Sequence, residues 1–316
     1  MKLIIQIPCL NEAGTLDLAL SKLPKEVPGF DCVEWLVIDD GSTDDTVNVA
    51  KANGVDHIIS HPQNLGLARA FMTGITASLS LGADVIINTD ADDQYDASCI
   101  PDLVRPILDD EAEIVIGTRP IHSIEHFSPL KKIFQKIGSA VVRLASNTNV
   151  GDAPSGFRAI SRSAALQLNV FSEYTYTLET IIQAGMKRMK VVSVPVRVNK
   201  DLRPSRLVHS IPSYIYRSIL TIIRISITYK PLKFFAIIGM FLFAVGLMLN
   251  IRWLFLFFND PSHARVPSLI LGLTFIIGSF FSLAIGILGD LLSVNRRLLE
   301  DIRTRLLSHD MGHRHD

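Results

Sequence analysis

The stretch D-V-I-I-N-T-D-A-D-D-Q, residues 84–94, places a short apolar run directly before a group of carboxylates. Three other runs have a similar apolar character and also end at a polar or turn-forming residue, namely 3–7, 34–38 and 113–116. Runs of this kind are typical of strands buried on both faces of a parallel sheet. Helical stretches such as 43–53 and 67–81 separate them, so the sequence predicts an α/β fold with a mostly parallel sheet.

Polar side chains gather where the predicted strands end. They are Asn11, Glu12, Asp39, Asp40, Asp90 and Arg119. In open α/β sheets, ligands bind outside the carboxyl ends of the strands. The sequence therefore predicts a functional site at this edge of the sheet.

The chain lacks the glycine-rich cradles that usually hold phosphates. No G-x-G-x-x-G follows the first predicted strand, and G-x-x-x-x-G-K-[ST] does not occur. Residues 89–94 instead provide hard oxygen ligands, which suit Mg²⁺ or Mn²⁺ completed by substrate phosphates. Acidic loops also occur as solvated turns or helix caps. The position after a buried strand, opposite Asp39 and Asp40, favours the functional interpretation.

Composition narrows the class of protein. The 316 residues include 31 Lys+Arg and 31 Asp+Glu, 48% are hydrophobic, and the mean hydropathy is +0.31. These values exclude general disorder and a nucleic-acid binder held by global charge. The three cysteines offer neither zinc spacing nor a disulfide framework, which indicates a reducing compartment. The high apolar content points to membrane segments.

Two uncharged segments have the length of membrane spans. Residues 234–251 would extend roughly 27 Å and residues 266–289 roughly 36 Å as helices, against a hydrocarbon core of about 30 Å. Basic residues flank the outer ends of the pair, namely Arg217, Arg224, Lys230, Lys233, Arg296, Arg297, Arg303 and Arg305. The connecting loop carries only Arg252 and Arg265. The positive-inside rule predicts a hairpin in the cell membrane with both termini and the first 200 residues cytoplasmic.

Between the soluble part and the spans, residues 210–230 place Arg217 and Arg224 seven positions apart, on one face of a helix, with Ile and Tyr on the other faces. They predict a helix in the membrane interface, with packing on the soluble domain as the alternative. The predicted domains are thus a catalytic domain at 1–209, this helix at 210–230, a transmembrane hairpin at 231–292 and a cytoplasmic tail at 293–316. No signal peptide is expected at the N-terminus.

Six motifs in order carry a family resemblance. They are I-P-C-L-N-E (7–12), V-I-D-D-G-S-T-D-D-T (37–46), N-L-G-L-A (64–68), T-D-A-D-D-Q (89–94), G-T-R (117–119) and S-G-F-R-A (155–159). About residues 1–210 resemble the inverting glycosyltransferases with the glycosyltransferase A fold, a Rossmann-like, mostly parallel sheet. More narrowly, the chain is similar to the dolichyl- and undecaprenyl-phosphate glycosyltransferases. The Gln-x-x-Arg-Trp signature of processive polysaccharide synthases is absent, which favours transfer of one sugar per turnover.

The resemblance implies a role for each matching residue on the donor side. The nucleotide would be bound by Pro8, Asn11, Glu12, Asp39, Asp40 and Asp90. The divalent cation would be held by Asp90, Asp92 and Gln94. Asp93 lies between these ligands, and its role stays open between the site and a solvated helix start.

The acceptor side needs positive charge. The resemblance places the lipid phosphate near Arg119 and Lys132, and near a closing loop that contains Lys200, Arg203 and Arg206. That loop departs from the family pattern, because its glycine is missing and Arg206 replaces a lysine. Contact with lipid headgroups is the alternative for these loop residues. Arg158 is left open between the acceptor and a structural ion pair.

The reaction expected from the resemblance is transfer of one sugar, with inversion, from a UDP- or GDP-sugar to a polyprenyl phosphate in cell-envelope glycan biosynthesis. Asp90, Asp92 and Arg119 would be its catalytic residues. A phosphate monoester is mostly dianionic at pH 7 and needs no general base. Transfer to diacylglycerol or a sugar hydroxyl would need one, with Glu179 or Asp152 as candidates. A non-catalytic nucleotide-sugar scaffold and a homo-oligomer packed through glycines of the spans also stay open.

Overall fold

The computed structural model describes residues 1–120, 146, 148, 150–170, 176–199, 220, 223, 224, 226–259 and 266–312, with side chains up to residue 307. The chain divides into two compact units. The first contains residues 1–222 and 303–316, and the second contains residues 223–302.

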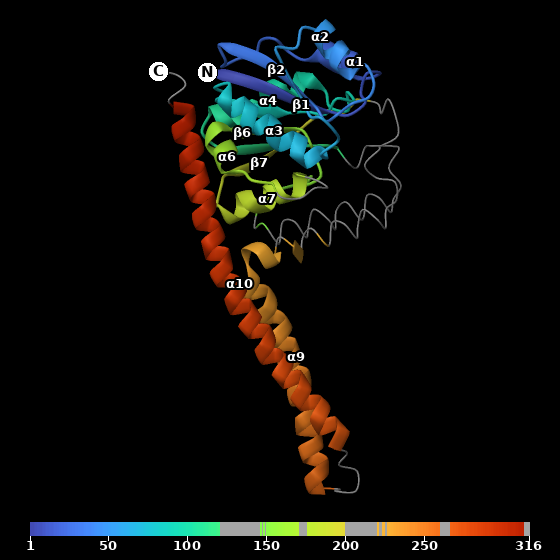
Figure 1. Ribbon diagram of the computed structural model, residues 1–316, viewed down its shortest axis with the longest axis vertical. Helices are drawn as coiled ribbons and strands as arrows, with labels where there is room; N and C mark the ends of the chain where they lie inside the picture. Colours follow the sequence, from blue (N-terminus) through green and yellow to red (C-terminus); the bar gives the residue numbers. More distant parts are fainter. Residues whose placement is uncertain are drawn as a thin grey trace. The chain divides into compact units, whose positions relative to one another are not determined.

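The first unit is built on a seven-stranded sheet (Figure 1). Its strands are β1 (Lys2–Cys9), β2 (Cys32–Asp39), β3 (His57–Ser60), β4 (Val85–Asn88), β5 (Ile114–Thr118), β6 (Arg158–Ser161) and β7 (Val191–Pro195). Their order is β3-β2-β1-β4-β6-β5-β7, and β6 alone among them runs antiparallel to its neighbours. The predicted mostly parallel sheet is therefore confirmed, and four of its strands coincide with the apolar runs.

Helices cover both faces of this sheet. They are α1 (Leu16–Lys22), α2 (Thr46–Ala52), α3 (Leu67–Ser80), α4 (Ile100–Leu108), α6 (Arg162–Gln167) and α7 (Thr177–Met186), with a 3₁₀ turn at Ala97–Cys99. Leu3, Ile5 and Ile7 of β1 join the core cluster that includes Leu20 of α1 and Val104 of α4. The intervening residues of β1 point to the opposite face, which α3 covers. Apolar residues on both faces of one strand explain why β1 is buried throughout.

The register brings the predicted site together. Cys9 of β1 pairs with Asp39 of β2, and Gln6 of β1 pairs with Asn88 of β4. The loops after these three parallel strands therefore leave the sheet at the same edge. This edge carries Asn11, Asp39 and Asp90.

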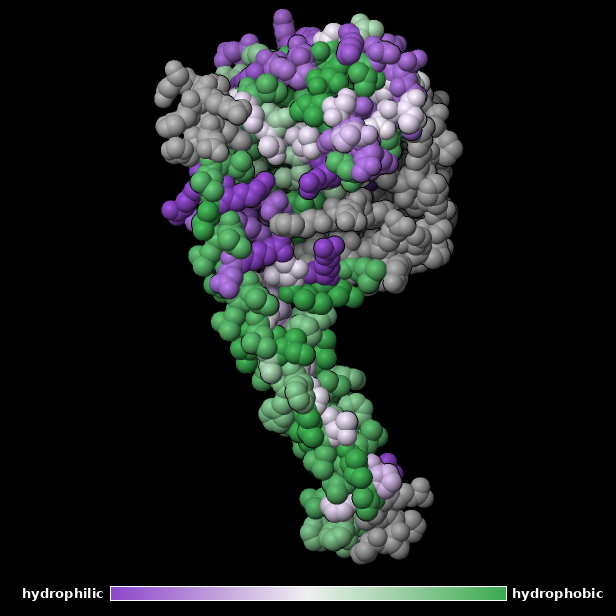
Figure 2. Space-filling view, in the orientation of Figure 1, coloured by the Kyte–Doolittle hydropathy of each residue, from purple (hydrophilic) through white to green (hydrophobic). Residues whose placement is uncertain are grey.

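The second unit consists mainly of two long helices, α9 (Pro231–Asn259) and α10 (Val266–Gly312), the latter continuing beyond residue 302. A Cβ on Gly246 would lie 2.7 Å from the carbonyl oxygen of Gly272, so glycine lets the helices approach closely there. Many of their large apolar side chains are exposed, among them Phe241 at 67%. Figure 2 shows this apolar surface along the pair.

Both helices are long and apolar enough to cross a membrane, with best-window mean hydropathies of 2.4 and 2.3. They contain the two predicted spans, so the helical nature of those spans is confirmed. Most of the predicted interfacial helix at 210–230 lies outside the described residues.

Candidate active site

The loops after β1 and β2 are tied to each other by side chain–backbone hydrogen bonds. Asn11, with φ of 54°, donates its N–H to Ser42 Oγ at 2.9 Å and accepts at Oδ1 from the Thr43 N–H at 2.8 Å. Asp39 accepts the Ser42 N–H at 2.9 Å and is only 4% exposed. Asparagine suits this position because it tolerates the left-handed backbone region and bonds locally. Two residues predicted for the nucleotide therefore stand in one interlocked pair of loops.

Glu12 and Pro8 lie beside these loops. The Glu12 N–H donates to Thr46 Oγ1 at 2.8 Å, and its Oε2 accepts from Thr15 Oγ1 at 2.9 Å. Pro8 is a buried residue of β1 paired with Ile38 of β2. Pro8 can thus shape the wall of a site, whereas the negative charge of Glu12 acts on Asp90.

Asp40 has a different environment from its neighbour Asp39. Its Oδ1 accepts the Leu65 N–H at 2.9 Å and lies 2.7 Å from His61 Nδ1, and its Oδ2 accepts the Gly66 N–H at 2.9 Å. The residue is 3% exposed. Asp40 therefore fixes the loop that leads into α3, which gives the N-L-G-L-A motif a structural explanation. Its predicted contact with the nucleotide stays a prediction.

Asp90 begins the acidic loop after β4, close to Gly156. A Cβ on Gly156 would lie 2.9 Å and 3.0 Å from the two carboxylate oxygens of Asp90, so glycine is needed for this approach. Burial, and then the charge of Asp92, raise the pKa of Asp90 to about 7, although Arg119 and Arg158 act in the opposite direction. A cation beside both carboxylates would relieve these two penalties.

The predicted ligands could supply part of the coordination shell of a divalent cation. Asp92 is close enough to repel the charge of Asp90, and Gln94 follows in the same loop. Within the described ranges, no group of three or more His, Cys, Asp and Glu side chains could hold a metal. Two carboxylates and one amide oxygen leave coordination positions for substrate phosphates, as is typical of Mg²⁺.

Arg119, just after β5, is fixed by a bidentate pair with Asp152. Its Nε and one Nη donate to the two carboxylate oxygens at 2.6 and 3.0 Å. Its other Nη lies 3.5 Å from Gln94 Oε1. Burial acts to lower the pKa of Arg119, but Tyr95 and Asp152 outweigh it and raise that pKa. The guanidinium is a permanent positive charge beside the acidic loop.

Arg158 is 1% exposed and holds the Ser155–Phe157 turn against the start of α7. It donates to the carbonyl oxygens of Ser155, Ala153 and Thr177 at 2.9–3.0 Å, and also to Thr180 Oγ1. Burial lowers its pKa. Arg158 therefore has a structural role. It fulfils this role through bonds to carbonyl oxygens and not through an ion pair.

Asn88 and Tyr176 hold Gly156 in place through hydrogen bonds. Asn88 Nδ2 donates to the Gly156 carbonyl at 2.9 Å and lies 2.8 Å from the Tyr176 hydroxyl. The Tyr176 ring stacks on Phe71 of α3 at 3.9 Å between centroids. Sequence reasoning missed both residues. An asparagine that ends an otherwise apolar strand was the available signal for Asn88.

The structure brings together Pro8, Asn11, Glu12, Asp39, Asp40, Asp90, Asp92, Gln94 and Arg119 at one edge of the sheet. The remaining predicted acceptor residues, Lys132, Lys200, Arg203 and Arg206, lie outside the described residues.

Comparison with known proteins supports the same assignment. The model of glycosyl transferase family 2 matches residues 4–168, more than half of the 316 residues. A UDP-N-acetylglucosamine–dolichyl-phosphate N-acetylglucosaminyltransferase from Methanococcus voltae is 30% identical, covering 60% of this chain and 83% of that protein. An undecaprenyl-phosphate mannosyltransferase from Micrococcus luteus is 27% identical, covering 66% and 88%.

A solved structure extends this comparison to the fold. Glucosyl-3-phosphoglycerate synthase from Mycobacterium tuberculosis, in complex with Mn²⁺, UDP-glucose and phosphoglyceric acid, matches with a TM-score of 0.55 at 21% identity. The match covers 70% of this chain and 79% of that one. At this identity the likeness shows the fold alone. The predicted glycosyltransferase A fold and the predicted resemblance to polyprenyl-phosphate glycosyltransferases are confirmed.

Proposed function

The chain belongs to glycosyl transferase family 2, and we infer from this premise that it transfers one sugar from a nucleotide-sugar donor to a polyprenyl phosphate at a membrane. The observation that carries the proposal is the juxtaposition of Asp90 and Asp92 with the fixed charge of Arg119. Carboxylates suit a cation that binds a diphosphate, whereas a guanidinium suits a phosphate directly. The site thus has one part for each of two anionic substrates.

On the donor side, Asn11, Asp39 and Glu12 would bind the base and ribose. A carboxylate accepts from ring N–H groups or ribose hydroxyls, and an unpaired buried group of this kind costs about 1–3 kcal/mol. Asp90, Asp92 and Gln94 would hold Mg²⁺ or Mn²⁺, which when bound neutralises the diphosphate and stabilises the leaving group. The Mn²⁺, Mg²⁺ and UDP named with structures of glucosyl-3-phosphoglycerate synthase support this choice.

On the acceptor side, Arg119 would orient a lipid phosphate for in-line attack on the anomeric carbon. The attacking phosphate is already ionised, so no residue has to take a proton. Asp152 is fully buried and accepts from Arg119, and Glu179 is 4% exposed and accepts from Gln183 Nε2 at 3.2 Å. These environments favour a phosphate acceptor over a hydroxyl acceptor. The names of the Methanococcus and Micrococcus relatives agree with it.

We further propose that α9 and α10 cross the cell membrane as a hairpin with both termini cytoplasmic. Their exposed apolar side chains and the basic residues at Lys230, Lys233, Arg296 and Arg297 support this orientation. A polyprenyl phosphate has its phosphate at the membrane surface, where a tethered catalytic domain can reach it. The expected domains at 1–209, 210–230, 231–292 and 293–316 are part of this proposal.

The test is a transfer assay with the full chain in lipid nanodiscs. Radiolabelled UDP- and GDP-sugars are offered with Mn²⁺ and with either undecaprenyl phosphate or diacylglycerol. We expect labelled undecaprenyl phosphate with an inverted anomeric centre by NMR, and loss of transfer in excess EDTA. Transfer to diacylglycerol alone, retention of configuration, or full activity in EDTA would contradict the proposal.

A further inference from the structure

We propose that Asp93 is a positioning residue that, with Lys22 and Asn199, forms a latch holding the acidic loop in the conformation that binds the divalent cation. The inference rests on the proposed function, because it assigns the cation to Asp90, Asp92 and Gln94. Asp93 lies between the last two of these ligands in the sequence. The latch explains why a third carboxylate occupies a position that coordination itself does not require.

Both oxygens of the Asp93 carboxylate are taken up by protein partners. Lys22, the last residue of α1, forms an ion pair with Oδ2. Asn199 Nδ2 lies 3.1 Å from Oδ1 and 3.0 Å from the Asp93 carbonyl oxygen. Asp93 is 6% exposed, whereas the Lys22 side chain is 41% exposed, so the ion pair is shielded from water at its aspartate end. The carboxylate is therefore directed at α1 and at the segment after β7.

The backbone at Asp93 needs such support. Its φ of 56° lies in the left-handed region, which non-glycine residues adopt at a cost and aspartate tolerates better than most. The Asn199 N–H donates to the Gln94 carbonyl at 2.9 Å, and Val198 forms an antiparallel bridge with Tyr95. The segment 198–199 therefore binds the loop at three consecutive residues, 93–95. Fixing these residues also fixes the spacing between Asp92 and Gln94.

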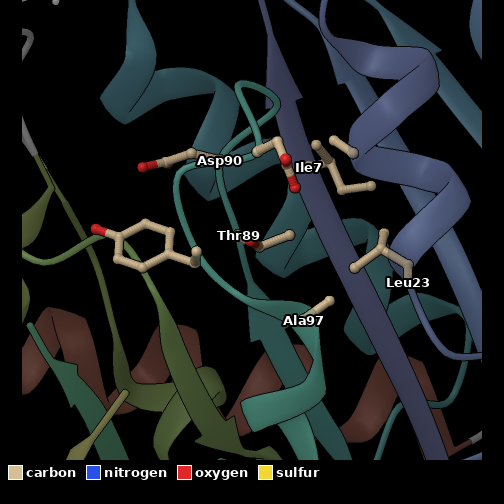
Figure 3. A pocket seen from close by; sticks show the side chains of 8 residues that line it. Ile7, Leu23, Thr89, Asp90 and Ala97 are labelled. Atoms are coloured by element: carbon tan, nitrogen blue, oxygen red, sulfur yellow. The ribbon is translucent and has the colours of Figure 1, made fainter. Parts of the chain in front are cut away.

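The side chains between the acidic loop and α1 leave a small cavity, so apolar packing alone does not hold the loop in place there. A cavity of about 10 Å³ lies between the loop and α1, with room for about one water molecule. Figure 3 shows Thr89 and Ala97 on the loop side of this cavity and Ile7 and Leu23 on the side of β1 and α1. Asp93 lines this cavity, and its ion pair with Lys22 connects the loop to α1.

Replacement of Lys22 tests the latch through the direction in which the Mn²⁺ affinity changes. The ammonium group of Lys22 lies near a proposed cation site, so its removal would tighten cation binding if only long-range charge mattered. The latch predicts the opposite result, because without Lys22 the loop loses its tie to α1. Outer partners of metal ligands commonly change metal affinity by about 10–100-fold. We therefore expect Lys22→Met to weaken Mn²⁺ binding by about 10-fold.

The experiment measures Mn²⁺ affinity of the full-length protein in detergent, from the loss of the free Mn²⁺ EPR signal, with and without UDP. Asp93→Asn keeps the acceptor for Asn199 and the tolerance of positive φ but loses the charge, so it should match Lys22→Met at about 10-fold weaker binding. The double variant should be no weaker than either single variant, as expected for two residues that act as one pair. Thermal unfolding is recorded for every variant.

Two matched controls separate the latch from general effects. Asp110→Asn changes another aspartate at positive φ, 57°, which is exposed and remote in the sequence from the loop. Lys25→Met removes a nearby exposed lysine that pairs with Asp56 instead. Both controls should leave Mn²⁺ affinity within about twofold of wild type.

The outcomes are distinct. Unchanged or tighter Mn²⁺ binding by Lys22→Met overturns the latch, as does a loss of thermal stability in Asp93→Asn without a change in affinity. Weaker binding by Asp93→Asn together with tighter binding by Lys22→Met would mean that both residues act on the cation through their charges alone, which also overturns the latch. If the wild-type protein binds no Mn²⁺, the metal assignment in the proposed function fails, and the latch fails with it.

Discussion

The loops after β2 and β4 leave the same edge of the sheet, and each carries an aspartate near its start, but the two carboxylates have different environments. Asp40 is 3% exposed, whereas Asp90 is only partly buried. Asp40 receives two backbone N–H groups and a histidine nitrogen. Asp90, within the part of the chain that the structure describes, accepts no hydrogen bond, and its pKa is raised to about 7 by burial and Asp92. A carboxylate satisfied by its own chain stabilises the fold, whereas an unsatisfied one beside a second carboxylate is prepared for a ligand.

Asp152 extends the comparison and gives the largest expected effect. It is fully buried and accepts two hydrogen bonds from the Arg119 side chain. Asp152→Ala leaves the guanidinium without its partner, and breaking a buried pair in this way costs about 3–5 kcal/mol. Urea unfolding in detergent should report this loss. An unfolding free energy within 1 kcal/mol of wild type would show that Asp152 does not belong with the satisfied carboxylates.

Asp90→Asn should produce the reverse pattern, a loss of function without a loss of stability. Removal of one preorganised charge from a site costs about 10²–10³ in rate, or about 3–4 kcal/mol in the barrier. The stability should be unchanged or higher, because the repulsion from Asp92 disappears. Initial rates of sugar transfer and urea unfolding of the same preparation check both parts. A stability loss as large as that of Asp152→Ala would contradict the comparison.

Asp40→Ala removes the carboxylate that is hydrogen-bonded by its own chain, and we expect a smaller loss of stability than for Asp152→Ala. The change leaves the Leu65 N–H without its acceptor, whereas the Gly66 N–H keeps Asn64 Oδ1 at 2.9 Å, and an unsatisfied buried group costs about 1–3 kcal/mol. We expect an unfolding free energy lower by about 2 kcal/mol. The affinity for UDP, measured by calorimetry at a temperature where the variant is folded, should stay close to that of wild type. A large loss of UDP affinity without loss of stability would instead favour the predicted nucleotide contact.

The sheet was largely predictable from the sequence because its central strands are apolar on both faces. The runs at 3–7 and 34–38 lie within β1 and β2, and the runs at 84–88 and 113–116 overlap β4 and β5. None of these apolar runs predicts β3, β6 or β7, and β6 in particular is short, antiparallel and begins with the buried Arg158. No local pattern predicts that an arginine is buried, since the partners of Arg158 are the carbonyl oxygens of Ala153, Ser155 and Thr177 and the Thr180 hydroxyl.

The residues that form the site were predictable from the sequence, but the role of each residue was not. Asp39 and Asp40 are adjacent, and only the tertiary contacts of the loop before α3 distinguish them. The sequence offers Asp152 as a candidate general base, because its pairing with Arg119, 33 positions away, cannot be read from spacing. Asp93 was left open for the same reason, since its partners are Lys22 and Asn199.

Per pH unit, the smallest expected effect is the pH dependence of stability that arises at the unsatisfied carboxylate. In EDTA the pKa of Asp90 is about 7 in the folded protein against 3.8 as the ordinary value. Between about pH 4 and 7 the folded state therefore retains a proton that the unfolded state has lost, so the unfolding free energy falls as the pH rises through this window and is flat above it.

One proton limits this slope to about 1.4 kcal/mol per pH unit. Other groups titrate in the same range, so the informative quantity is the difference between wild type and Asp90→Asn, measured by urea unfolding in detergent. That difference should decline with rising pH from 4 to 7, and Mn²⁺ should weaken the trend, because a bound cation favours the ionised carboxylate in the folded state. A difference independent of pH would mean that Asp90 ionises as readily in the folded protein as in the unfolded chain, and the contrast with Asp40 would lose its electrostatic basis.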